Sequence, residues 1–125
     1  MDSLIIYPTR HTPEVNFDAL TGNLALKGGS VPENTYEFYE PILEWIDRYV
    51  ENSQYSTVLD VHMTYFNTTS SKHLLEIFRR MEAIQKKGKE VLIKWYYISE
   101  EEDMLEAGSD YQSIVKIPFE IIEIK

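Results

Sequence analysis

The sequence predicts an α/β fold, a mixed β-sheet whose helices pack mainly on one face. Two segments, 35–52 and 70–87, carry apolar residues at helical spacing, and two others, 57–66 and 91–97, alternate apolar with polar residues. A strand–helix–strand order favours parallel neighbours joined by right-handed crossovers. Alternation in the two strands indicates that one sheet face is packed and that the other is partly open.

Short strands are predicted ahead of the first helix. The apolar run at 4–8 stops at a proline. Residues 15–20 and 20–27 are typical of a β-hairpin, because a Gly-Asn turn signal precedes the alternation of the second segment. The glycine pair at 28–29 then ends the strand.

The first helix is predicted to be capped by Asn34. Asn34 and Glu37 have the spacing of a capping box, with asparagine in the place of the usual serine or threonine. Pro41 fits poorly, since a proline inside a helix removes one hydrogen bond. Two interpretations stay open: the helix kinks at Pro41, or it starts near Glu40 with the proline in its first turn.

The strand at 57–66 is predicted to be half-buried. Its alternation assigns four side chains to the packed face: Leu59, Val61, Met63 and Tyr65. Asp60 and His62 point to the opposite, wetter face, and exposure there explains this pair as well as a catalytic role does.

The remaining elements follow the second helix, which Gly88 is expected to end. They are the strand at 91–97, an acidic loop or short helix at 100–111, and a last strand at 118–125. The whole order is therefore two or three strands, helix, strand, helix, strand, acidic segment and strand.

Composition narrows the class of protein. The chain has 125 residues, which is enough for one domain with a proper core, and no cysteine, which excludes disulfides and thiolate chemistry. The net charge of -9 argues against nucleic acid and anionic membranes as partners. With no basic apolar leader and no run long enough to span a bilayer, we expect a soluble cytoplasmic protein.

Four consecutive hydroxyl side chains stand between a predicted strand and the second helix. They are Thr68, Thr69, Ser70 and Ser71. One of them is expected to be the N-cap of the helix, because serine and threonine are common caps. A cap explains one hydroxyl and not four, and a phosphate would suit the positive end of a helix. Local chemistry leaves both interpretations open.

No catalytic or metal site is predicted. The chain contains no G-x-S-x-G elbow, P-loop, G-x-G-x-x-G or H-E-x-x-H motif. His73 lies one turn beyond Thr68 and Thr69, where it is expected to be a solvated helix residue or a phosphate contact. The acidic run at 100–103 lacks the ligand spacing of an EF-hand. We therefore expect no enzyme activity, no metal and no cofactor.

Four stretches together are similar to one known family. They are TPEVNFD at 12–18, GSVPEN at 29–34, YFNTTSSKHLLEIF at 65–78, and KWYY at 94–97 with EDMLEAGSDY at 102–111 and PFE at 118–120. In this order they resemble the SiaC family of bacterial regulatory phosphoproteins, small relatives of the STAS fold of anti-sigma factor antagonists. The resemblance implies a single STAS-like domain over 1–125. Val31 departs from the family, which usually has an aromatic residue there.

The resemblance also implies a switch. Family members are phosphorylated on the threonine after the asparagine, here Thr68 after Asn67, with Thr69 as an alternative acceptor. A cognate kinase adds the phosphate, a PP2C-type phosphatase removes it, and the unphosphorylated form binds a target, in the best-known systems a diguanylate cyclase in biofilm and c-di-GMP control. The implied partner-binding residues are Asn67, Thr69, Ser70 and Ser71 with Gly29, Ser30, Pro32, Glu33 and Asn34.

Two other hypotheses remain beside this one. A tyrosine-rich sheet face is typical of a protein-binding surface, but it would also suit a small-molecule-binding domain. Alternatively, the chain is a purely structural interaction domain in which residues 65–72 only begin a helix.

Overall fold

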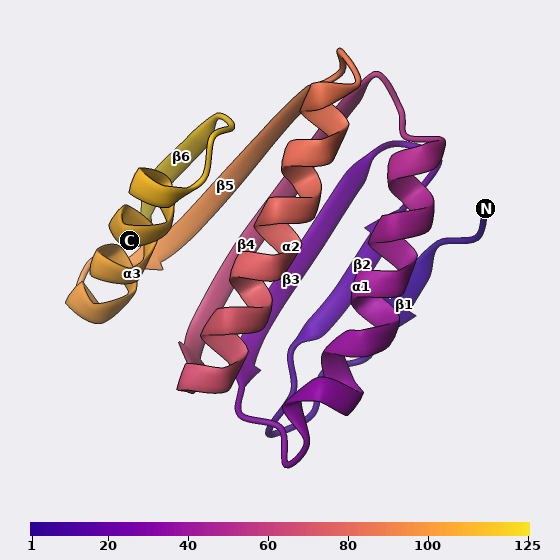
Figure 1. The fold of residues 1–125 in the computed structure, drawn as a ribbon. Coiled ribbons are helices and arrows are strands. Elements are labelled where there is room, and N and C mark those ends of the chain that lie inside the picture. The colour runs from indigo at the N-terminus through magenta and orange to yellow at the C-terminus, as the bar shows by residue number, and fades with distance from the viewer.

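A computed structural model describes all 125 residues as one six-stranded sheet with three helices (Figure 1). In chain order the elements are β1 (Leu4–Ile6), β2 (Glu14–Asp18), β3 (Asn23–Ser30), α1 (Thr35–Glu51), β4 (Ser56–Phe66), α2 (Thr68–Lys86), β5 (Glu90–Ile98), α3 (Glu102–Ile114) and β6 (Phe119–Ile124).

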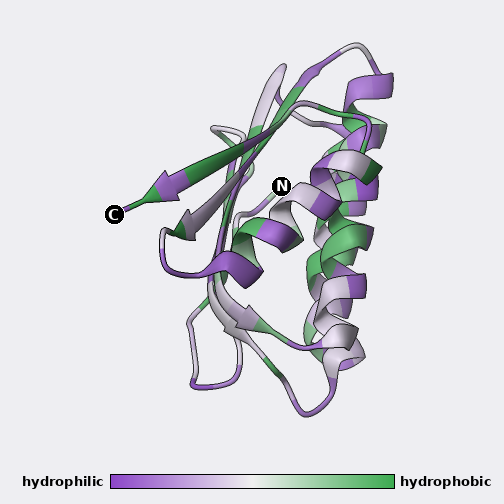
Figure 2. Ribbon diagram, turned by 90° about the vertical axis from the view of Figure 1, so that its left-hand side faces the viewer, coloured by the Kyte–Doolittle hydropathy of each residue, from purple (hydrophilic) through white to green (hydrophobic).

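The strands lie in the sheet in the same order as in the chain. β1, β2 and β3 pair antiparallel, whereas β3 to β6 pair parallel through α1, α2 and α3. Each crossover advances one strand in the same direction, and right-handed crossovers of that kind place every helix on the same side. Seen edge-on, the helices indeed lie on one face of the sheet (Figure 2). This confirms the predicted fold class.

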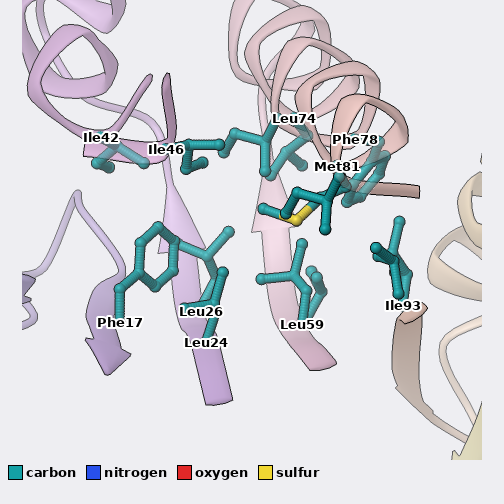
Figure 3. Packing of buried hydrophobic residues seen from close by; sticks show 14 of the residues in the cluster. Phe17, Leu24, Leu26, Ile42, Ile46, Leu59, Leu74, Phe78, Met81 and Ile93 are labelled. Carbon is teal, nitrogen blue, oxygen red and sulfur yellow. The ribbon is translucent and has the colours of Figure 1, made fainter. Parts of the chain in front are cut away.

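The core lies between the sheet and the two long helices. Figure 3 shows side chains of β3, β4 and β5 pointing toward side chains of α1 and α2. The labelled residues are Phe17, Leu24, Leu26, Leu59 and Ile93 from the sheet, and Ile42, Ile46, Leu74, Phe78 and Met81 from the helices. All of these side chains are fully buried, so apolar burial holds the helices at fixed positions on the sheet.

The opposite sheet face carries no helix. Asp60 and His62 of β4 are half-buried there, as the alternation of β4 predicts. The Tyr96 hydroxyl donates to the Asp60 carboxylate at 3.3 Å. The pKa of Tyr96 is raised, first by burial and then by the Asp60 charge, so the hydroxyl keeps its proton.

The predicted position of Tyr65 on the packed face is wrong. The pairing of β3 with β4 shifts between Gly28 and Gly29, which leaves Thr64 without a partner residue. Such a bulge reverses the alternation beyond it. Tyr65 is therefore 45% exposed, while Phe66 packs against the core.

The helices begin where their caps place them. The Asn34 side chain accepts the Glu37 N–H at 3.0 Å, so α1 starts at Thr35 and contains Pro41, rather than starting near Glu40.

The acidic segment forms the helix α3 between β5 and β6. None of the three helices combines the length and the hydropathy that crossing a membrane requires.

Candidate functional site

Two strand-to-helix junctions meet at one end of the sheet, at the lower edge of Figure 1. β3 ends at Ser30 before α1, and β4 ends at Phe66 before α2. Because β3 and β4 are parallel neighbours, their carboxyl ends lie together. The Asn67 N–H donates to the Ser30 carbonyl at 3.2 Å, which joins the junctions through the backbone.

Asn67 caps the second helix. Its side-chain oxygen accepts the Ser70 N–H at 2.8 Å and the Thr69 hydroxyl at 3.2 Å. Its backbone is extended, as an N-cap requires. The expectation that one of the four hydroxyl residues is the cap is therefore wrong, because the side chain of the preceding asparagine accepts the N–H that a cap must satisfy.

Three of the four hydroxyl groups are engaged in hydrogen bonds. Thr69 bonds Asn67 and also Thr35 of α1, whose hydroxyl oxygen lies 2.9 Å away. Ser70 is fully buried, and the Ser71 hydroxyl donates to the Thr68 carbonyl at 2.7 Å.

The Thr68 hydroxyl alone makes no hydrogen bond within the protein. Thr68 is the first residue of α2, and its side chain is exposed. The structure thus confirms the predicted place of Thr68 at the start of the second helix with an accessible hydroxyl.

The surroundings of Thr68 are suited to negative charge. The first turn of α2 holds no acidic residue, and a helix N-terminus carries a partial positive charge. Lys72 is exposed one turn further on and makes no ion pair within the protein, so its ammonium group is free. An anion attached to Thr68 would therefore meet no resident carboxylate of this helix turn.

The His73 ring is held by other contacts and not by the Thr68 side chain. Its Nδ1–H donates to the Thr69 carbonyl at 2.9 Å, since a carbonyl oxygen can only accept. Its ring stacks on Tyr39 of α1, with ring centroids 5.1 Å apart and planes 16° from parallel. His73 is therefore half-buried, with its ring held against Tyr39 and its Nδ1–H bonded to the Thr69 carbonyl.

The 29–34 turn lies beside α2 as expected, but only part of it is exposed. Glu33 and Asn34 are at the surface, whereas Ser30 and Pro32 are buried. The sequence led us to expect that Ser30 and Ser70 contact a partner directly. Neither side chain has an exposed atom that could form such a contact. These two side chains lie beneath the surface that Thr68 and the exposed turn residues form.

Gly29 has a separate reason to be glycine. The Tyr65 ring covers it so closely that a Cβ at residue 29 would lie 2.2 Å from the ring. The Tyr65 hydroxyl donates to the Arg10 carbonyl at 2.9 Å, which holds the ring in place. Gly29 therefore lies directly beneath the Tyr65 ring, where no larger residue fits.

Asn67 and Thr68 should differ in their effect on stability. We expect Asn67→Ala to lower the free energy of unfolding by about 0.5–2 kcal/mol, because it removes the cap of α2. Thr68→Ala should change it by less than about 0.5 kcal/mol, since the lost hydroxyl has no bond to break. Urea unfolding followed by circular dichroism measures both, and the reverse order would make Thr68 the cap.

Tyr39 is the residue that sequence reasoning missed. The helical spacing of apolar residues places Tyr39 on the packed face of the first helix but assigns its hydroxyl no partner, and that hydroxyl bonds Ser30 at the centre of the junction. The available signal was the hydroxyl itself, because a tyrosine on a buried helix face needs a hydrogen-bond partner.

Comparison with known proteins agrees with this geometry. A sequence model described as SiaC family regulatory phosphoprotein matches residues 6–124. The chain belongs to the SiaC family. An uncharacterised protein of Pseudomonas aeruginosa strain UCBPP-PA14 is 31% identical over 121 residues, which are 97% of this chain and 96% of that protein.

Solved structures of the SiaC family have the same fold. SiaC of Pseudomonas aeruginosa is 29% identical and superposes with a TM-score of 0.91 over 99% of this chain and 100% of its own. Another match is a crystal structure of the diguanylate cyclase SiaD in complex with its activator SiaC, also from Pseudomonas aeruginosa. The matching chain there is 30% identical, with a TM-score of 0.91 over 97% of this chain and 99% of that one.

Proposed function

We propose that this chain is a regulatory phosphoprotein that binds a target enzyme through the surface around Thr68 and is released by phosphorylation of Thr68. A diguanylate cyclase is the target that the family suggests, because SiaC forms a complex with the cyclase SiaD as its activator. In this proposal the chain catalyses no reaction of its own and requires no cofactor.

One observation carries the choice of Thr68. Of the four adjacent hydroxyl groups, only that of Thr68 is exposed and free of hydrogen bonds. A kinase can bring it to ATP without breaking a bond of the fold. Phosphorylation of Thr69, the alternative acceptor, would first break its bonds to Asn67 and Thr35.

The phosphate would act as a block at the surface. It adds about -1.5 to -2 charges at neutral pH, and the N-terminus of α2 tolerates them in the free protein. Covering that dianion with an unpaired partner surface is strongly unfavourable. The fold need not change, since the charge itself prevents docking.

The switch needs two further partners. A cognate protein kinase adds the phosphate, and a PP2C-type phosphatase restores the hydroxyl. We propose that this protein, the kinase and the phosphatase all act in the cytoplasm, where ATP is available to the kinase.

The acceptor is tested by labelling with the cognate kinase. We expect one phosphate per chain, mapped by mass spectrometry to Thr68, and no labelling of Thr68→Ala. Ser71→Ala is the matched control, because it removes a neighbouring hydroxyl and should be labelled like the wild type. Labelling that persists in Thr68→Ala would move the acceptor to Thr69 and contradict the proposal.

A further inference from the structure

Beneath Thr68 lies a chain of three buried hydroxyl groups from three elements. Tyr39 comes from α1, Ser30 from the end of β3 and Ser70 from α2, and all three are 0% exposed. The Ser30 hydroxyl oxygen lies 2.6 Å from that of Tyr39 and 2.9 Å from that of Ser70. The Ser70 hydroxyl also lies 2.9 Å from the Ser30 carbonyl.

The direction of every bond in this chain follows from counting protons. A carbonyl only accepts, so the single Ser70 proton goes to the Ser30 carbonyl. Ser30 must then donate to Ser70, and Tyr39 must donate to Ser30. Burial raises the pKa of Tyr39, which keeps its proton in place for this bond. Each of the three hydroxyl protons, of Tyr39, Ser30 and Ser70, therefore has one acceptor.

This hydroxyl chain holds the first turn of α2 from the inside. Ser70 follows Thr68 and Thr69 in that turn, and Ser30 belongs to the 29–34 turn that precedes α1. On the outside, the Thr35–Thr69 hydrogen bond joins the two helix starts. The position of Thr68 relative to the turn thus depends in part on the bonds among Tyr39, Ser30 and Ser70, which are buried and which no partner can reach.

We propose that the Tyr39–Ser30–Ser70 hydroxyl chain positions the surface around Thr68 for its target. A surface that is already in its bound arrangement loses less conformational freedom when the partner docks. These three side chains are positioning residues and touch no partner. The inference rests on the proposed function, because it assumes that the target docks beside Thr68.

The opposite end of α1 offers a matched control. There the Tyr49 hydroxyl, also 0% exposed, lies 2.8 Å from the Thr57 hydroxyl at the start of β4. Tyr49 follows Tyr39 by ten residues, which separates them by about 15 Å along the helix. Tyr39→Phe and Tyr49→Phe each remove one buried hydroxyl and keep the ring.

The test is a calorimetric titration of purified diguanylate cyclase with this protein and its variants. The cyclases used are SiaD of Pseudomonas aeruginosa and those of the organism that encodes this protein. We expect both Phe variants to melt at similarly lowered temperatures. Tyr39→Phe should weaken cyclase binding about tenfold, within the range of typical site-to-site coupling. Tyr49→Phe should bind like the wild type. Ser30→Ala, which breaks both links of the chain, should bind more weakly than Tyr39→Phe.

Equal affinities for Tyr39→Phe and Tyr49→Phe would overturn the inference, because the hydroxyl chain would then serve stability alone. Thr68→Asp in the same titration separates the two claims. If Thr68→Asp loses affinity and Tyr39→Phe does not, only the positioning role fails. If the wild type binds no cyclase, the proposed function and the inference fail together.

Discussion

Thr68→Asp is expected to weaken binding of the target cyclase by at least about tenfold, or roughly 1.4 kcal/mol. Thr68→Asn should bind like the wild type. The two side chains have the same shape, and only aspartate carries a charge into the interface, where it would lie unpaired. In the free protein the N-terminus of α2 favours that charge by about 0.3–1 kcal/mol, so loss of binding would not reflect loss of folding.

The pair is compared by titration at low and at physiological salt, with the melting temperature of each variant as a folding control. The difference between Asp and Asn should persist at physiological salt, because a charge buried in the interface is screened much less than an exposed one. Equal affinity of the two variants at low salt would show that charge at this position does not control docking.

Trp95→Ala is expected to have the largest effect on stability, a loss of about 3–5 kcal/mol. Trp95 is fully buried, and its ring lies 5.4 Å from that of Tyr111, measured between centroids. The indole N–H donates to the Met104 carbonyl at 2.8 Å, which anchors α3. A Cβ on Gly108 would lie 2.5 Å from the Trp95 ring, so α3 approaches the tryptophan as closely as a helix can.

The effect of Trp95 should reach the candidate site. The Tyr111 hydroxyl donates to the Ser71 carbonyl at 2.8 Å, and Tyr111 packs on Trp95, so α3 supports the first turn of α2. Tyr97→Ala is the control, since Tyr97 lies two residues along β5 and is only half-buried. Urea unfolding that showed equal losses for Trp95→Ala and Tyr97→Ala would contradict the role of Trp95 as the anchor of α3.

The main elements could be predicted because their signals are local. Apolar spacing and the Asn34 cap predict α1 over 35–52, and the structure has it at Thr35–Glu51. The alternation of β4 and β5 and their separation by a helix predict a parallel sheet packed on one side. These features depend on neighbouring residues in the chain and not on distant contacts.

The errors arise where distant residues decide the outcome. Phe66 rather than Tyr65 packs against the core because β4 has a bulge opposite Gly28 and Gly29. No pattern within β4 reveals that bulge. The hydroxyl run predicts the wrong cap for α2 because serine and threonine are common N-caps, although asparagine is an equally good one. Asn67 takes the role since its oxygen reaches the Ser70 N–H.

The sequence predicts where the candidate site lies in the fold, but not which of its side chains are buried. Sequence order places the 29–34 turn and residues 67–71 at the same edge of a parallel sheet. It does not show which side chains face inward there. Ser30 and Ser70 are buried and bond each other across 40 residues, and only the folded chain brings them together.

The central claim is that phosphate on Thr68 controls access to the target. The most direct measurement titrates the diguanylate cyclase with this protein in two forms, unphosphorylated and fully phosphorylated on Thr68. We predict that the unphosphorylated form binds and raises cyclase activity, and that the phosphorylated form does neither while its melting temperature is unchanged. Equal binding of the two forms would contradict the account and would leave residues 65–72 as the start of a helix in a structural domain.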